Sequence, residues 1–324
     1  MRMWILLLLL SLFTLAVMPA AAQEDEIVAN LAGGRVIIHV ANDGIAFAAV
    51  DRPLEAKSVP PRVAAIGSSH VGVFFGASEW QVPAQPMPIR LDKNIGDVRP
   101  TKAGAYRPPG SGEADLELIG VGFLEKLRPL VAQLHHKIDL KPDEPLLQIV
   151  LIGYAPQGYG AEVWLIDYRA EQKIVNSTGD FLQTNLLRPR FTQLYPPEKH
   201  QAKTLVEVNF PASAQDIPLA GMIQANDPHI AQLRSSDVRF NKVAEHIDRG
   251  QASKVTMQDA VDFLRAALPF VAGNGGFVEA EIGENGGFDW IVPPQEPREK
   301  VQRAQDKDRP ADAPTLIRKP DVDH

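Results

Sequence analysis

The chain contains no cysteine. This absence excludes disulfide bonds, cysteine nucleophiles, thiolate metal sites and the lipidated cysteine of a lipoprotein. Small exported domains often depend on disulfides, but a chain of 324 residues can bury enough apolar surface without them.

The chain also lacks an excess of positive charge. Its 33 Lys and Arg residues face 40 Asp and Glu residues, giving a net charge of −7, which argues against general nucleic-acid binding. After residue 22 no stretch is apolar for long enough to span a bilayer. The glycine-rich stretches 158–160 and 274–276 do not follow a phosphate-loop pattern. We therefore expect no cofactor, no bound metal and no nucleic-acid partner.

Residues 1–22 have the composition of a secretory signal peptide. Arg2 supplies a positive charge, Trp4–Met18 is an apolar stretch of 15 residues, and Ala20–Ala22 matches the small-residue pattern of a cleavage site. The alternative is an uncleaved membrane anchor, for which the apolar stretch is short. We expect cleavage before Gln23 and an exported mature protein, periplasmic or secreted, with no membrane contact after cleavage.

Residues 34–51 predict a hairpin at the centre of the protein. Segments 35–40 and 45–50 are apolar and rich in β-branched residues, and the Asn-Asp-Gly of positions 42–44 favours a narrow turn between them. The lack of alternation in the second segment is typical of a strand covered on both faces. Three further strand pairs are expected at residues 62–75, 146–168 and 277–292.

Two amphipathic helices separate these strand pairs. Residues 113–136 and 256–271 place apolar side chains at steps of three and four residues, which makes one apolar stripe on each helix. At the start of the second helix, Thr256 and Asp259 have the spacing of a capping box, in which the Asp carboxylate returns to the cap.

Three segments fall outside the hairpin and helix pattern. Residues 79–112 are rich in proline and predict a long surface excursion. Residues 181–251 are interpreted as an elaboration of a main domain that spans 23–293. Residues 294–324 are charged and contain few large apolar side chains, so we expect a disordered carboxyl-terminal tail.

The order hairpin, hairpin, helix, hairpin, elaboration, helix, hairpin indicates an α+β protein with helices packed outside stacked sheets. Four segments follow this order: RVIIHVANDGIAFAAVDRP, RVAAIGSSHVGVFFGASEW, LLQIVLIGYAPQGYGAEVWLIDY, and TMQDAVDFLRAAL with FVEAEIGENGGFDWI. In sequence and in order, these segments resemble the proteasome β-subunit group of N-terminal nucleophile hydrolases. The resemblance implies a four-layer αββα sandwich, with two stacked antiparallel sheets between helix layers, and a homo-oligomer of at least two copies.

The resemblance also points to one end of the central hairpin. In the family a Thr at the start of the first strand attacks through its hydroxyl, and its own amine acts as base. The matching position lies around Gly34, which has no hydroxyl. Asp51 falls near the family's Asp, and Arg62 takes the place of its Lys, although a permanently charged guanidinium is a poor substitute for a tuned amine. Ser177 echoes a later Ser-Gly segment.

No cut in the chain can restore the missing nucleophile. From Gln23 to Lys57 the chain has no Ser, Thr or Cys, and starting at Ser58 would discard the central hairpin. Two hypotheses stay open. The protein is a non-catalytic relative that acts in assembly or binds a peptide, a protein or another ligand, or it is a peptidase or amidohydrolase with a displaced Ser or Thr nucleophile.

Structural roles are the alternative for the polar residues near the hairpin. Asp51 and Arg62 are expected to form an ion pair with each other. His39 lies on an apolar strand and is expected to be a core histidine with its hydrogen bonds satisfied.

Overall fold

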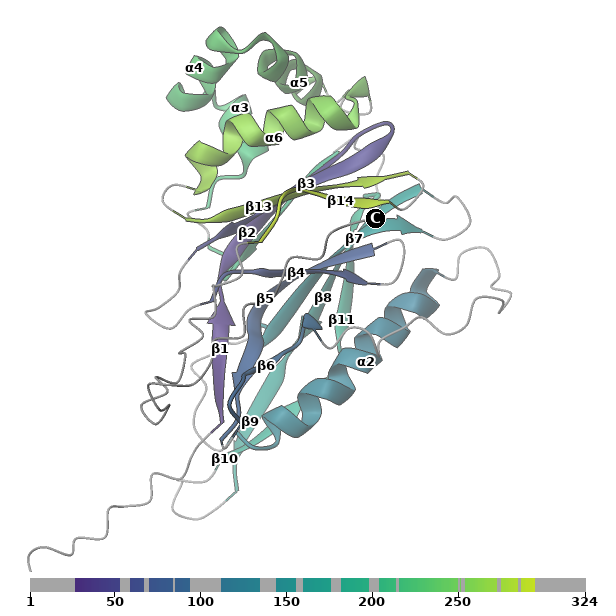
Figure 1. Cartoon of the computed structure of the whole chain (residues 1–324), viewed down its shortest axis with the longest axis vertical. Coiled ribbons are helices and arrows are strands. Elements are labelled where there is room, and N and C mark those ends of the chain that lie inside the picture. The colour runs from purple at the N-terminus through teal and green to yellow at the C-terminus, as the bar shows by residue number, and fades with distance from the viewer. Residues whose placement is uncertain are drawn as a thin grey trace, which may run out of the picture. The chain divides into compact units, whose positions relative to one another are not determined.

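A computed structural model describes residues 27–294, except for 53–58, 67–69, 84, 94–111, 135–143, 156–159, 176–181, 198–203, 214–215, 250, 252–253, 273–274 and 285–286 (Figure 1). The predicted signal peptide, the predicted tail beyond Pro294, and Ser177 therefore lie outside the described residues. Within that part of the chain, no helix has both the length and the hydropathy needed to cross a membrane.

The central hairpin lies inside a five-stranded antiparallel sheet. The strand order is β12-β2-β3-β13-β14. Gly34 pairs with Asp51 at the open end of the hairpin and Val40 pairs with Ile45 at the turn. The bounds are β2 Gly34–Val40, β3 Gly44–Asp51, β12 Leu205–Phe210, β13 Phe277–Gly283 and β14 Phe288–Val292.

A seven-stranded sheet forms around the long strand β5. Its main order is β1-β5-β7-β8-β11, and β4 and β6 also pair with β5. Strands β9 and β10 make a separate two-stranded ribbon. The bounds are β1 Val28–Ala32, β4 Arg62–Ile66, β5 His70–Gln81, β6 Ile89–Arg90, β7 Leu147–Ala155, β8 Gly160–Tyr168, β9 Ala170–Ile174, β10 Leu182–Leu186 and β11 Arg190–Tyr195.

The helices accompany different sheets (Figure 1). Helices α3 to α6 gather on one side of the five-stranded sheet, and α2 runs along the seven-stranded sheet. Their bounds are α2 Gly112–Val131, α3 Leu219–Gln224, α4 Pro228–Ser236, α5 Val238–Asp248 and α6 Met257–Ala272.

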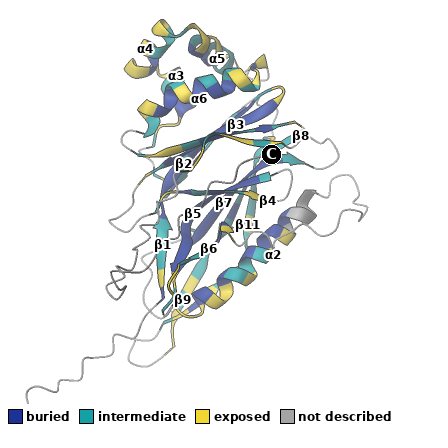
Figure 2. Cartoon of the chain, viewed as in Figure 1, coloured by how far each residue is buried: buried dark blue, intermediate teal, exposed yellow. Residues whose placement is uncertain are grey.

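Successive side chains of β2 point to opposite faces of the sheet, and both faces are buried (Figure 2). Val36 and Ile38 share an apolar cluster with residues of the seven-stranded sheet, such as Val150. Ile37 points the other way and packs with the buried side chains of α3 to α6, such as Phe263. The prediction of an α+β protein built from antiparallel strands is confirmed, and so is a central hairpin covered on both faces.

Three predicted segments differ from the structure. Strand β5 continues to Gln81, into the predicted excursion. The strand passes through Gly76, whose φ of 76° a glycine adopts readily, and beyond it Trp80 is fully buried. Helix α2 ends at Val131, two residues after Pro129. The range 181–251 provides β11 and β12, which are edge strands of the two sheets, and it also provides α3 to α5.

The start of α6 is capped from two places in the sequence. The hydroxyl of Thr256 accepts a hydrogen bond from the backbone N of Asp259 at 3.2 Å, as the capping box predicts. The Asp259 carboxylate instead accepts from Nζ of Lys242 at 3.2 Å. Oδ1 of Asp43, in the β2–β3 turn, accepts from the backbone N of Met257 at 2.6 Å. The central hairpin therefore helps to fix the helix that packs on it.

Candidate functional site

The open end of the β2–β3 hairpin is where the resemblance locates chemistry, and it is closely packed around Gly34. A Cβ atom added to Gly34 would collide with the carbonyl oxygen of Val50 and would lie 2.6 Å from Cγ of Pro61 and 2.9 Å from Cε1 of Phe75. Those separations are shorter than van der Waals contact. The position that would hold the family's Thr therefore has no space for a side chain.

Asp51 lies directly opposite Gly34 and is held by its backbone. Its backbone N donates to the carbonyl of Gly276 at 2.8 Å. Its Oδ1 atom is buried and has no hydrogen-bond partner among the described residues. Burial raises the pKa of Asp51, because the charged carboxylate loses solvation. This strand end therefore carries a carboxyl with a raised pKa opposite a glycine.

Arg62 does not pair with Asp51, so the predicted ion pair between them is wrong. Nη2 of Arg62 donates to Oε2 of Glu79 at 2.8 Å, and Oε1 of Glu79 accepts from Nδ2 of Asn30 at 3.0 Å. The physical reason is that the two residues belong to different sheets. Arg62 lies on β4 opposite Phe74, whose ring contacts Phe123 of α2, on the face turned away from the β2–β3 hairpin.

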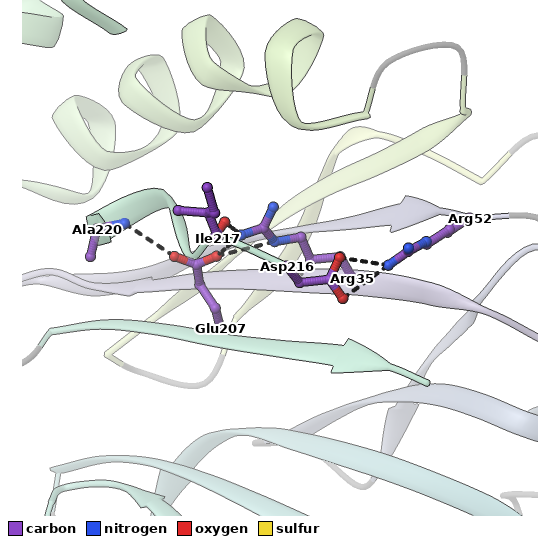
Figure 3. Close-up of polar contacts among 6 residues, drawn as sticks. All are labelled: Arg35, Arg52, Glu207, Asp216, Ile217 and Ala220. Carbon is purple, nitrogen blue, oxygen red and sulfur yellow. Dashed lines mark hydrogen bonds and ion pairs between the residues drawn. The ribbon is translucent and has the colours of Figure 1, made fainter. Parts of the chain in front are cut away.

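Two ion pairs that no local sequence pattern indicates flank the Gly34–Asp51 end (Figure 3). Nε of Arg35 donates to Oε2 of Glu207 at 3.1 Å, and Nη2 donates to the same oxygen and to the carbonyl of Ile217 at 2.8 Å. Nη1 of Arg52 contacts both carboxylate oxygens of Asp216, at 2.7 and 2.9 Å. The Arg35–Glu207 pair joins β2 to β12, and the bonds of Arg35 to Ile217 and of Arg52 to Asp216 bind the segment after β12 to the ends of the central strands.

Glu207 is the buried member of this cluster. Its side chain is 6 % exposed, and burial raises the pKa of its carboxyl, an effect that the Arg35 guanidinium opposes. Oε1 also accepts from the backbone N of Ala220 at 3.3 Å, near the start of α3. A buried carboxylate with this many donors has a structural role, since its oxygens are engaged by the protein itself.

His39 is buried but unsatisfied, which corrects the prediction of a satisfied core histidine. Its side chain is fully buried, and neither ring nitrogen has a partner among the described residues. The ring meets Phe263 of α6 edge-on, with centroids 6.2 Å apart. Burial lowers the pKa of His39 from 6.5 to about 4, so the imidazole is neutral at pH 7.

A second cluster of polar side chains lies in the seven-stranded sheet, where β5 begins. Nε2 of His70 lies 2.7 Å from Oε1 of Glu162, and Nε1 of Trp164 donates to Oε2 of Glu162 at 2.8 Å. His70 and Glu162 flank Gly153 of β7 in the strand register. Because Gly153 has no side chain, the two can meet above the strand between them. His70 and Glu162 are 92 residues apart in the sequence, so no local motif could indicate their contact.

No metal site is formed by the described residues, since none of their His, Asp and Glu side chains gather in groups of three or more suited to an ion. Of the predicted site residues, Gly34 and Asp51 are brought together, Arg62 turns to Glu79, and Ser177 lies outside the described residues. No protein-family model matches the chain, and no curated protein is significantly similar to it.

Proposed function

We propose that this protein is an exported, non-catalytic relative of the proteasome β-subunit group, and that it acts in binding or assembly. The proposed architecture is the four-layer αββα sandwich. Its support is that one apolar cluster joins the two large sheets, a second joins β2 and β3 to α3–α6, and a third joins the seven-stranded sheet to α2.

The observation that carries the proposal is the environment of Gly34. N-terminal nucleophile chemistry requires a hydroxyl or thiol at the start of the first hairpin strand, beside a free α-amino group. Gly34 supplies no such group, and Val50, Pro61 and Phe75 occupy the space that a larger residue would need. The carboxyl of Asp51 does not replace the paired hydroxyl and α-amine that this chemistry uses.

The chain upstream of Gly34 adds a second argument. Strand β1, Val28–Ala32, precedes β2 and pairs with β5 along residues 76–81. Ala32 is fully buried, and the backbone N of Val59 donates to the carbonyl of Leu31 at 3.1 Å. A free amino terminus at Gly34 would therefore require removal of a strand that is part of the folded sheet.

The flanking ion pairs favour a binding or structural role for this strand end. Arg35 and Arg52 bind Glu207 and Asp216, so both guanidinium groups have carboxylate partners within the protein. Catalytic sites commonly hold polar groups ready for a reacting molecule, whereas these groups hold the segment after β12 in place. The ligand class that the proposal favours is a peptide or another protein.

The amino terminus of the mature protein tests this proposal. Protein purified from the exported fraction should begin at Gln23 or its cyclised form, as determined by mass spectrometry of the intact chain. A mature chain that begins with Ser or Thr and cleaves peptides would instead support a hydrolase with a displaced nucleophile.

A further inference from the structure

Carboxylates gather on the helix side of the five-stranded sheet where it extends beyond α6. Helix α6 packs mainly on β3, and β13 and β14 continue the sheet past it. Arg265 of α6 contacts Glu279 of β13, so Glu281, two residues further along the strand, lies on the same side. Asp289 of β14 is the register partner of Glu281 and therefore shares that side as well.

Glu281 and Asp289 meet as like charges. They are directly opposed across the antiparallel pair, a position in which two carboxylates repel each other. Glu281 is half-buried and Asp289 is exposed, and neither has a cationic partner among the described residues. The half-buried side chain of Ile291 lies on the same side. It offers apolar surface that the methylene stem of an arginine or lysine can cover.

Glu279 adds a buried charge to this side. Its side chain is 0 % exposed. Oε2 accepts a hydrogen bond from Nε of Arg265 at 3.3 Å, but Oε1 is buried and has no hydrogen-bond partner among the described residues. Burial raises the pKa of Glu279, and although Arg265 opposes this effect, the carboxylates of Asp262 and Glu281 add to it. The charge of Glu279 is therefore only partly offset within the protein.

The neighbouring arginines are already engaged. Nη1 of Arg239, on α5, donates to Oδ2 of Asp262 at 3.0 Å, and Arg265 pairs with Glu279. These two pairs leave the opposed carboxylates of Glu281 and Asp289 uncompensated.

We propose that the helix side of β13 and β14 binds a basic segment of another protein, with an arginine side chain set between Glu281 and Asp289. The inference rests on the proposed binding role and names the chemistry of its ligand. A guanidinium carries five donors in a planar fork, so it can bridge two neighbouring carboxylates and remove their repulsion.

Charge selects this occupant over the alternatives. A second copy of the chain has a net charge of −7 and would add to the repulsion. The residues after Pro294 include seven Lys or Arg and seven Asp or Glu, so they supply no net positive charge. The described residues contain no group of His, Asp and Glu suited to a metal ion.

Peptide binding tests the site in the full-length mature protein. The probe is a fluorescein-labelled peptide of alternating Arg and Ala residues, followed by fluorescence anisotropy at low salt. Replacing both unpaired charges, by Glu281→Gln with Asp289→Asn, should weaken binding by about tenfold or more, because the lost bonds are charge-assisted. The same variant should be at least as stable as wild type in thermal unfolding, since two like charges no longer face each other.

A matched control changes the net charge equally at a distance from the site. Glu125→Gln with Glu171→Gln replaces two exposed carboxylates, on α2 and on β9. Because the attraction of exposed charges is screened over such distances, peptide binding should stay within about twofold of wild type.

The inference is overturned if wild type does not bind the peptide at low salt, or if the two double variants bind it equally well. It is also overturned if Glu281→Gln with Asp289→Asn unfolds at a lower temperature than wild type, which would assign these carboxylates to the fold. A dimer that forms without peptide and is lost in that variant would make a second copy the occupant, again overturning it.

Mass spectrometry of the recovered peptide separates this inference from the non-catalytic proposal. Intact peptide that binds both double variants equally contradicts only the site on β13 and β14. Cleaved peptide whose binding still depends on Glu281 and Asp289 contradicts only the non-catalytic proposal.

Discussion

Gly34 and Asp51 are register partners at the open end of the β2–β3 hairpin, and they lie between the Arg35–Glu207 and Arg52–Asp216 ion pairs. A proteasome-like hydrolase would have its nucleophile and a supporting carboxyl at this strand end. In this protein a carboxyl is present, and the residue opposite it is a glycine packed against Val50, Pro61 and Phe75.

A threonine introduced at position 34 should damage the fold rather than create an enzyme. Gly34→Thr places a branched side chain against the Val50 carbonyl, Pro61 and Phe75. Because the Val50 carbonyl and the Pro61 ring are rigid, we expect a loss of about 3 kcal/mol in the free energy of unfolding, at the upper end of the usual cost of overpacking, measured by urea denaturation. Gly276→Ala is the matched control, since a Cβ there has no neighbour within 4 Å, and it should be nearly neutral. A stable Gly34→Thr protein would contradict this account of the site.

The Arg35–Glu207 pair should be important for stability. Arg35→Ala leaves the Glu207 carboxyl, which is 6 % exposed, without its cationic partner. Breaking a buried pair by removing one member costs about 3–5 kcal/mol, and we expect a loss of about 3 kcal/mol in the free energy of unfolding, measured by thermal or urea denaturation.

The exposed Lys173–Glu171 pair provides the comparison for this measurement. Its side chains are 61 % and 52 % exposed, so Lys173→Ala should cost less than about 1 kcal/mol. Equal effects of Arg35→Ala and Lys173→Ala would show that the Arg35–Glu207 pair is not an anchor.

His39 should make the protein less stable in acid. Its folded-state pKa of about 4 lies below the ordinary value of 6.5, so the unfolded chain takes up the proton first as the pH falls. The stability that neutral His39 contributes is present above pH 6.5, declines between 6.5 and about 4, and is then lost. The decline amounts to about 3 kcal/mol, at 1.36 kcal/mol per pKa unit.

His39→Leu should remove this part of the pH dependence. The measurement is the difference in unfolding free energy between wild type and variant, followed from pH 8 to pH 4 in urea. Buried carboxyls with raised pKa values, such as Glu207, are common to both proteins and cancel in the difference. A difference that stays constant over this range would exclude His39 as the titrating group.

Local sequence patterns predicted the hairpins well because their information lies within a few residues. Asn42, Asp43 and Gly44 define a turn whose flanking strands pair in register from Gly34 to Asp51. Thr256 caps α6 as its spacing predicts. The Asp43 cap of the same helix comes from 214 residues away, so no local pattern could indicate it.

The polar contacts of the candidate site were not predictable for the same reason. Arg35 and Glu207 are 172 residues apart, and they meet only because β12 pairs with β2. Arg62 was assigned to Asp51 by its place in the sequence, but its side chain faces the α2 side of the other sheet, where Glu79 lies. The face of a strand on which a charge lies depends on register and on sheet membership, which composition does not reveal.

The most direct test of the central claim is incubation of the purified mature protein with fluorogenic peptides and a threonine-reactive covalent inhibitor, followed by mass spectrometry. The account predicts no peptide turnover and no adduct, because the start of β2 has no attacking hydroxyl and no free amine. Turnover together with an adduct on the amino-terminal residue would contradict it. Turnover with an adduct at an internal Ser or Thr would also contradict it, in favour of the displaced-nucleophile hydrolase.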